Sequence, residues 1–214
     1  MIRPHLPVRA PSAAALGAGL LVLAFPLHAQ STGTRATAVF AGGCFWGIEA
    51  VFDHTKGVIS AVSGYAGGTT PHPSYELVSS ETTGYAESVR VTYDPSQVSY
   101  RQLLEIFFAV HDPTQLNRQG PDVGPSYRSA IFYRNDEQKR AAEAYIAQLT
   151  TERRYHGTIV TAVEPLTTFY EAEAYHQHYL EHHRYQPYIV INDLPKLRLL
   201  QRAFPALWRD APGT

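Results

Sequence analysis

The chain has 214 residues, of which 44% are apolar and 17% are charged, and its formal net charge is −1. This composition suits one well-buried domain and excludes a highly charged disordered chain. The small net charge argues against binding of nucleic acid by electrostatic attraction. A single cysteine excludes an internal disulfide, a four-thiolate zinc site and a dithiol cycle resolved within the chain.

The N-terminus has the features of a secretory signal peptide. Arg3 and Arg9 precede an apolar run over residues 13–25, and Ala29 is a small residue suited to cleavage. The run is short for a bilayer span, so we expect a leader over residues 1–29 rather than an anchor. Its removal takes away two arginines and no acid, which lowers the net charge from −1 to about −3. We expect an exported protein, periplasmic or secreted, that does not associate with membranes.

A Ser/Thr-rich linker is predicted over residues 30–37, followed by one domain over residues 38–214. Residues 38–41 form an apolar run stopped by two glycines, and they predict a buried strand. Apolar residues at helical spacing predict a helix over 44–54, and residues 58–62 predict a second strand that a glycine-rich turn ends. Strand, helix and strand within about thirty residues are typical of a βαβ unit.

Strand and helix patterns continue to alternate in the second half of the chain. Further strands are predicted over residues 88–93, 128–134 and 158–163. Further helices are predicted from a capping box at Ser99 and over residues 136–153, 171–182 and 195–204. Residues 111–127 hold three prolines and two glycines and predict a long loop, and long loops in compact domains are often functional. The pattern indicates a single mixed α/β domain.

The most informative short segment is Gly43-Cys44-Phe45-Trp46-Gly47. It places the lone cysteine at the first turn of a predicted helix, where unpaired N–H groups and the helix dipole favour a thiolate. A lone cysteine is more often a small buried hydrophobe. Its place at a helix start, in an exported chain without other cysteines, favours a nucleophile.

This segment resembles the active-site signature of the A-type peptide methionine sulfoxide reductases. Six further blocks resemble the same family in the same order, at residues 63–68, 73–78, 83–87, 111–114, 122–129 and 172–177. The resemblance covers roughly residues 38–185, and several ordered blocks are far more specific than one short motif.

The resemblance implies a peptide-methionine (S)-S-oxide reductase that acts on free or protein-bound methionine sulfoxide. It implies an α/β (α+β) fold, a two-layer mixed-sheet sandwich with a ferredoxin-like core. It also implies that Cys44 is the catalytic nucleophile and Glu87 the catalytic proton donor. The substrate-binding residues that it implies are Phe45, Trp46, Tyr75, Asp122 and Tyr127.

The residue chemistry agrees with these roles. Sulfoxide reduction needs a soft nucleophile, a proton for the departing oxygen and an apolar wall for the methyl group. A carboxyl such as Glu87 keeps its proton at neutral pH when it lies in an apolar pocket. Phe45 and Trp46 can form the wall, although neighbours on a helix point in different directions and we expect one of them in the core.

The remaining implied residues would contact the polar parts of the substrate. Tyr75 and Tyr127 would donate hydrogen bonds to the sulfoxide oxygen, and Asp122 would hold the substrate backbone. With 14 tyrosines in the chain, only the motif singles out these two.

Two positions depart from the family pattern. Tyr85 stands where histidine is common, and Ser79 stands where many relatives have a second cysteine. No other thiol exists in the chain, so a sulfenic acid at Cys44 needs an external thiol such as thioredoxin, glutaredoxin or glutathione. We expect no bound cofactor. The expected partners are this reductant and the substrates, free methionine sulfoxide and oxidised exported proteins awaiting repair, and the chain is expected to be a monomer.

Two other functions and a metal site remain to be weighed. A cysteine hydrolase or acyltransferase would need a histidine placed as a base for Cys44. A non-enzymatic alternative is an aromatic-lined binding module with an inert cysteine. His178 and His182 lie four residues apart and could face one metal from a helix, but a polar helix face is the better interpretation and no metal is expected.

Overall fold

The computed structural model describes residues 35–212, so the leader predicted over residues 1–29 lies outside the described part. Strand β1 (Ala36–Gly42) begins inside the segment interpreted as linker, because Ala36 and Thr37 already pair with Tyr93 and Thr92. Within residues 35–212, we find no helix with the length and apolar character needed to cross a bilayer.

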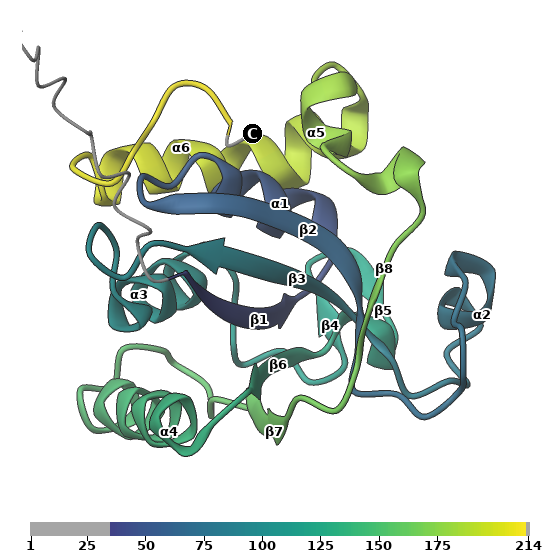
Figure 1. Ribbon diagram of the computed structural model, residues 1–214, viewed down its shortest axis with the longest axis horizontal. Coiled ribbons are helices and arrows are strands. Elements are labelled where there is room, and N and C mark those ends of the chain that lie inside the picture. The colour runs from purple at the N-terminus through teal and green to yellow at the C-terminus, as the bar shows by residue number, and fades with distance from the viewer. Residues whose placement is uncertain (1–34, 213–214) are drawn as a thin grey trace, which may run out of the picture. The chain divides into compact units, whose positions relative to one another are not determined.

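Six strands form one mixed sheet, which runs through the centre of Figure 1. In chain order they are β1, β2 (Val58–Ala66), β3 (Ala86–Tyr93), β6 (Ser129–Tyr133), β7 (Ala162–Pro165) and β8 (Phe169–Glu171). Their order across the sheet is β7-β6-β1-β3-β2-β8, and only the β6–β7 pair is parallel. Strands β1 and β2 are both antiparallel to β3, so the predicted βαβ unit has β3 inserted between its strands. The order β6-β1-β3-β2 is that of a ferredoxin-like core, and the predicted fold class is confirmed.

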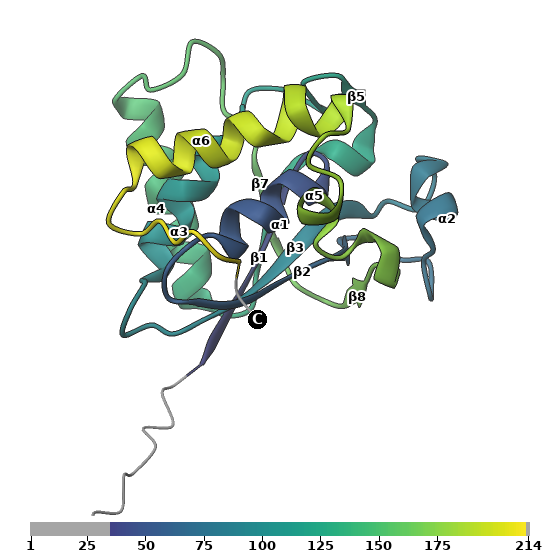
Figure 2. The same cartoon turned by 90° about the horizontal axis from the view of Figure 1, so that it is seen from above.

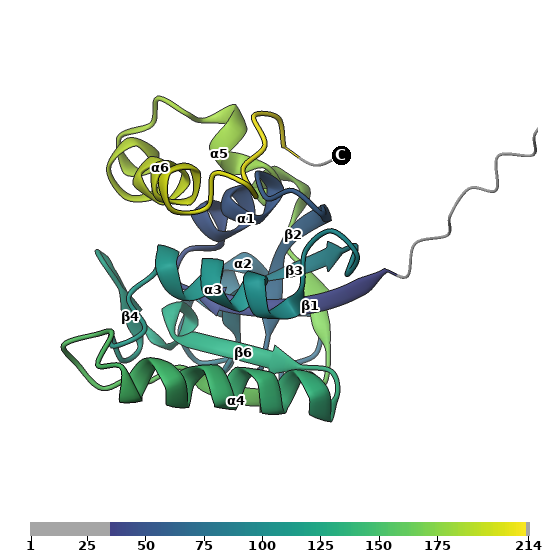
Figure 3. The ribbon, with the colours of Figure 1, turned by 90° about the vertical axis from the view of Figure 1, so that its left-hand side faces the viewer.

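The helices and the sheet form two layers. The helices are α1 (Phe45–Asp53), α2 (Tyr75–Ser79), α3 (Tyr100–Val110), α4 (Asp136–Thr151), α5 (Tyr179–His182) and α6 (Leu194–Ala203). Helix α1 packs on β2 and β3, α3 packs on β1, and α4 packs against β6 and β7. Helix α6 lies on the outer side of α1 (Figure 3), and α2 projects beyond the ends of β2 and β3 (Figure 2). The main apolar core lies between these helices and one face of the sheet.

The local sequence explains the best-predicted elements. Along β1, Ala38 and Phe40 face the helices, whereas Val39 and Ala41 join a smaller apolar cluster on the other face, as the two-residue period of a strand requires. The capping box at Ser99 is present and begins α3.

A glycine shapes the turn from β1 into α1. Gly43 has φ +88°, and a Cβ there would lie 2.5 Å from the Cβ atom of Gln119. Only glycine tolerates both the backbone conformation and the close approach. This turn places Cys44 at the N-cap of α1.

Several segments differ from the sequence prediction. The long loop over residues 111–127 contains the short hairpin β4 (Arg118–Gln119) and β5 (Asp122–Val123) and a 3₁₀ turn, Pro125–Tyr127. Strand β2 continues past its predicted end to Ala66, and β7 begins only at Ala162.

The helix predicted over residues 171–182 is wrong. The segment forms β8, a 3₁₀ turn (Ala174–His176) and the short α5, and His178 has φ 51° just before α5. Gln177 exchanges hydrogen bonds with the backbone of Ser63, and His178 bonds to two carboxylates of α1. These tertiary contacts override the local helical pattern, so His178 and His182 do not share a helix face.

Candidate active site

A cavity of about 280 Å³ opens at the N-terminal end of α1. The lining residues come from α1, α2, β3, β5, the 3₁₀ turn after β5 and the segment before α6. They are Cys44, Trp46, Tyr75, Glu87, Asp122, Tyr127, Gln186 and Tyr188. The structure therefore brings together all the site residues predicted from the sequence except the Phe45 ring.

Glu87 lies near the start of β3 and is 3% exposed. Its Oε2 atom accepts a hydrogen bond of 3.0 Å from the backbone N–H of Phe45, which leaves the other oxygen to carry a proton. Burial is the main cause that raises its pKa from 4.5 to about 8, and the Phe45 N–H opposes this shift. Asp122, Glu81 and Asp193 raise the pKa further. At neutral pH Glu87 is mostly a carboxylic acid, as a proton donor must be.

Cys44 is 7% exposed at the N-cap of α1. Burial raises the pKa of its thiol well above the usual value, and the charges of Glu87 and Asp193 raise it further. Lys196 and the backbone N–H of Trp46 act in the opposite direction. The expectation that the helix N-terminus favours a resting thiolate is therefore wrong, because desolvation outweighs the helix end. Cys44 rests as a thiol and must lose its proton during the reaction.

The two aromatic residues after Cys44 point in different directions. Trp46 lines the cavity, stacks on Tyr179 with ring centroids 3.8 Å apart, and donates a 3.1 Å hydrogen bond to Nδ1 of His176. Phe45 is 1% exposed, and its ring packs against Tyr65 and His176. Phe45 contributes to the site through its backbone N–H to Glu87, and its role as a substrate wall stays a prediction.

Three tyrosine hydroxyls share the cavity with the acids Glu87 and Asp122 and can donate hydrogen bonds there. Burial and the charge of Glu87 raise the pKa of both Tyr75 and Tyr127, so both phenols keep their protons at neutral pH. The Tyr188 hydroxyl donates a hydrogen bond to Oδ2 of Asp122. Tyr75 and Tyr127 can therefore donate hydrogen bonds to an oxygen atom in the cavity.

Gln186 and Tyr188 are lining residues that sequence reasoning missed. They follow the last block of the family resemblance and belong to no periodic pattern. Only the fold of the C-terminal segment brings them to the cavity. The sequence carried no signal for them.

The geometry also bears on the hydrolase alternative. None of the residues lining the cavity is a histidine. His176 accepts the Trp46 hydrogen bond, and burial lowers its pKa. His111 is bonded to the carbonyl of Phe107 and to Ser129. No histidine in this cavity wall can act as the base that a cysteine hydrolase needs.

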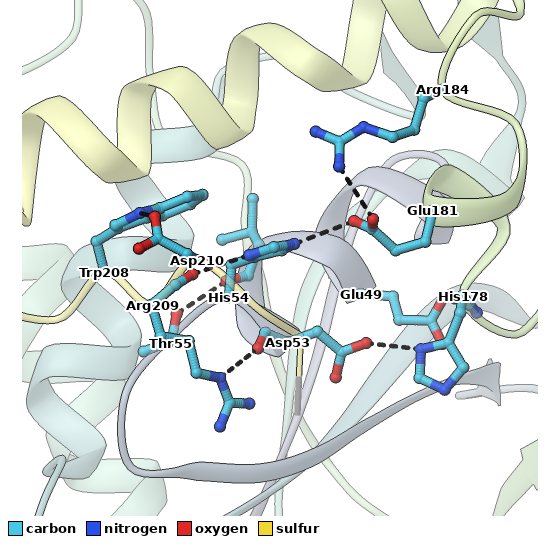
Figure 4. A network of polar contacts seen from close by, with 11 residues as sticks. Glu49, Asp53, His54, Thr55, His178, Glu181, Arg184, Trp208, Arg209 and Asp210 are labelled. Atoms are coloured by element: carbon cyan, nitrogen blue, oxygen red, sulfur yellow. Dashed lines mark hydrogen bonds and ion pairs between the residues drawn. The ribbon is translucent and has the colours of Figure 1, made fainter. Parts of the chain in front are cut away.

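A polar network fastens the segment around α5 to α1 (Figure 4). The backbone N–H of His178 donates to Glu49 Oε2 and its Nδ1 pairs with Asp53 Oδ2, both at 2.9 Å. His54 Nε2 bonds to Glu181 Oε1 at 3.0 Å. This network holds Tyr179, and Tyr179 backs Trp46 in the cavity wall.

The same network contains the donor types of a cation site. Glu49, Asp53 and His178 each offer a ligand atom within 4.8 Å of the others. Glu49 Oε2 and Asp53 Oδ2 already bond to His178, and Glu49 Oε1 has no hydrogen-bond partner in the described part of the chain. Because His178 is bonded to both carboxylates, we interpret the cluster as an anchor for the α5 segment. It differs from the His178 and His182 pair that the sequence suggested.

Glu49 makes stability depend on pH. Burial is the largest cause that raises its pKa from 4.5 to about 8, so the folded chain holds this proton more tightly than the unfolded chain. The free energy of unfolding should therefore fall as pH rises from about 4.5 to about 8. Glu49→Gln keeps an acceptor for the His178 N–H and removes the ionisation. Urea unfolding at about pH 5 and pH 8 should show a smaller loss of stability in this variant than in the wild type.

An exposed carboxyl on α4 gives the matched control for this experiment. Glu137→Gln should keep the wild-type dependence, because Glu137 is solvated in the folded chain. Equal pH dependence of the wild type and Glu49→Gln would contradict the role assigned to Glu49.

Comparison with known proteins agrees with this geometry. The family profile described as "Peptide methionine sulfoxide reductase" matches residues 36–206. The chain is 55% identical over 177 residues to the peptide methionine sulfoxide reductase MsrA 2 of Mesorhizobium japonicum, an alignment that covers 82% of this chain and 91% of that protein. It is 51% identical over 172 residues to the peptide methionine sulfoxide reductase MsrA of Thermus thermophilus, with 80% and 97% covered.

Solved structures of the same family share the fold. The reduced form of Mxr1 from Saccharomyces cerevisiae aligns with TM-score 0.68 at 32% identity, covering 72% of this chain and 89% of that chain. Methionine sulfoxide reductase A of Corynebacterium diphtheriae aligns with TM-score 0.65 at 36% identity, covering 74% and 80%. The resemblance noted in the sequence is confirmed: the chain belongs to the peptide methionine sulfoxide reductase family and is a peptide-methionine (S)-S-oxide reductase.

Proposed function

We propose that the chain reduces methionine S-sulfoxide through a sulfenic acid on Cys44 and regenerates this cysteine with an external thiol. The observation that carries this proposal is the position of the sole cysteine of the chain in one cavity with Glu87, whose carboxyl is protonated at neutral pH. A soft nucleophile and a proton donor face the same small space, as sulfoxide reduction requires.

The reaction moves one oxygen atom from substrate sulfur to cysteine sulfur. Glu87 donates a proton to the sulfoxide oxygen while Cys44 attacks the sulfur, and the thiol proton of Cys44 restores the carboxylic acid. The attack forms a bond between Sγ and the substrate sulfur; the hydroxyl then passes to Sγ, this sulfur–sulfur bond and the sulfur–oxygen bond of the substrate both break, and methionine leaves with its sulfur reduced by two electrons. Cys44 is oxidised by the same two electrons to the sulfenic acid. Glu87 ends the step as it began and acts as a proton carrier.

The other cavity residues orient the substrate for this step. The ring of Trp46 offers an apolar wall for the methyl group, and its position is fixed by Tyr179 and His176. Tyr75 and Tyr127 donate hydrogen bonds to the sulfoxide oxygen. Asp122 accepts from Tyr188 and keeps further lone pairs for an N–H of the substrate backbone.

Regeneration requires a thiol from outside the chain. Ser79, which stands where many relatives have a second cysteine, ends α2 and interacts with Tyr75 of the cavity. Its hydroxyl cannot form a disulfide with Cys44. An external thiol condenses with the sulfenic acid and releases water, and a second thiol attacks the mixed disulfide and frees Cys44. Thioredoxin, glutaredoxin and glutathione all supply this chemistry.

The dependence on an external thiol is directly measurable. With the S epimer and no thiol, methionine release should stop at one molecule per chain. Dithiothreitol, glutathione or thioredoxin should each be tested for continued release, which should occur with the S epimer and not with the R epimer. Many turnovers without any added thiol would contradict the proposal.

We also propose that the mature enzyme is exported and repairs oxidised proteins outside the cytoplasm. The support is the signal-peptide pattern of residues 1–29, which precedes the family match at residue 36. Mass spectrometry of the protein from separated cell fractions tests this directly. A chain that starts near Gln30 in the exported fraction is expected, and a full-length chain confined to the cytoplasm would contradict export.

A further inference from the structure

The segment between the cavity and α6 carries a buried ion pair. After Tyr188 the chain makes a π-helical turn, Ile189–Asp193, and continues into α6. Asp193 is 0% exposed, and its Oδ1 atom lies 2.9 Å from Nζ of Lys196, whose side chain is 14% exposed. Single π-helical turns within helices occur often at functional sites. A buried charge pair is costly to desolvate, so its place in the fold calls for an explanation.

The ion pair lies against the first turn of α1. A Cβ atom on Gly47 would come within 2.2 Å of Asp193 Oδ1 and 2.9 Å of Lys196 Nζ. Gly47 is three residues after Cys44, in the helical turn that Cys44 caps. The absence of a side chain at this position allows the ion pair to reach the turn that carries the nucleophile.

The charges around Cys44 are otherwise unfavourable for a thiolate. Glu87 and Asp122 line the cavity, and no lysine or arginine of the described chain lines it with them. Of the ionisable groups that act on the Cys44 thiol, Glu87 when ionised and Asp193 disfavour the thiolate, and Lys196 favours it. Lys196 is thus the ammonium group that opposes the carboxylates at this sulfur.

Other titratable groups face this site from several elements. The charge of an ionised Cys44 raises the pKa of the phenols of Tyr75, Tyr127 and Tyr188. The charge of Lys196 lowers the pKa of His111. All three phenols have a raised pKa and remain neutral at neutral pH, and burial keeps His111 neutral. Near neutral pH these four groups therefore add no charge at Cys44.

We propose that Lys196 is a positioning residue that stabilises the Cys44 thiolate as it forms, and that Asp193 holds the ammonium group against the first turn of α1. The proposal rests on the proposed function, because it gives Lys196 a role through the nucleophile. As the proton of Cys44 moves to Glu87, negative charge develops on a buried sulfur. A fixed ammonium group near that sulfur lowers the energy of the charged state without solvent reorganisation.

The ionisation of Cys44 can be measured without any sulfoxide. The chain has one cysteine, so the rate of alkylation by iodoacetamide as a function of pH reports Cys44 alone. Lys196→Met should slow alkylation near neutral pH by about tenfold, since one pKa unit changes the thiolate fraction about tenfold. Asp193→Asn should accelerate it by about tenfold, because the amide oxygen still accepts a hydrogen bond from the Lys196 ammonium group while the negative charge that disfavours the thiolate is lost. Lys196→Arg should restore most of the wild-type rate because it keeps the charge.

Further variants separate electrostatics from folding. The double variant Lys196→Met with Asp193→Asn leaves no unpaired buried charge, and its rate should lie between those of the single variants. Lys56→Met removes an exposed lysine with the same change in net charge and should leave the rate unchanged.

The outcomes of this experiment are distinct. Opposite changes in the two single variants would support the proposal, because a merely structural role would move both in the same direction. An unchanged alkylation profile in Lys196→Met, or equal changes in both single variants, would overturn it. Failure of the proposed function would instead appear as methionine formation by Cys44→Ser. That measurement is independent of the alkylation rates.

Discussion

Replacing Cys44 with serine should abolish methionine sulfoxide reduction while the chain stays folded. An alcohol is a poor nucleophile toward sulfoxide sulfur, and the chain holds no second thiol that could take over. Serine is also a good N-cap residue and is close to cysteine in size, so α1 should begin at the same position. The measurement is methionine formation from the S epimer with excess dithiothreitol.

The folded state of this variant needs a separate check. Circular dichroism and urea unfolding should match the wild type, because Cys44 adds only one small side chain to the buried core. Appreciable turnover by folded Cys44→Ser would exclude the assignment of the nucleophile.

The second large effect is expected for Glu87→Gln. The amide keeps an oxygen for the Phe45 N–H but cannot protonate the departing oxygen, so the single-turnover rate should fall by about 10²–10⁴-fold. In the wild type this rate should decline as pH rises through about 8, where Glu87 loses its proton, and the variant should lack this decline. Rapid-quench assays of methionine release across this pH range provide the measurement.

A buried carboxyl on the same side of the sheet gives a matched control. Glu49 also has a pKa raised to about 8, but it lies in the anchoring network and does not line the cavity. Glu49→Gln should therefore retain activity and the decline above pH 8. A rate for Glu87→Gln within about twofold of the wild type would assign the proton donor to another group.

Much of the fold could be predicted because local patterns were strong. The apolar run of β1, the capping box of α3 and the helical pattern of α4 each agree with the tertiary structure. The order of the strands was not readable from these patterns, and the family resemblance supplied the ferredoxin-like core.

The failures of prediction have a common physical cause. Residues 171–182 have a helical pattern, yet their conformation is determined by hydrogen bonds between Gln177 and β2 and between His178 and the carboxylates of α1. The resting state of Cys44 was mispredicted because the helix end was visible in the sequence and the burial was not. In both cases tertiary contacts outweighed a correct local argument.

The candidate site also contains residues that the sequence predicted and residues that it did not. The family resemblance at residues 43–47 and 83–87 identified Cys44, Trp46 and Glu87. Tyr188 and Lys196 lie beyond those blocks. Tyr188 reaches the cavity, and Lys196 reaches the first turn of α1, because the segment that enters α6 packs on α1. Their roles depend on packing that no local pattern encodes.

The central claim is that the oxygen of the substrate passes to Cys44. The most direct test mixes the chain with a stoichiometric amount of the S epimer, without any thiol, and follows methionine release together with the intact mass of the chain. We predict one methionine per chain and a chain heavier by one oxygen atom, located on Cys44 by a sulfenic acid probe. Release of methionine while Cys44 remains a free thiol of unchanged mass would contradict the account.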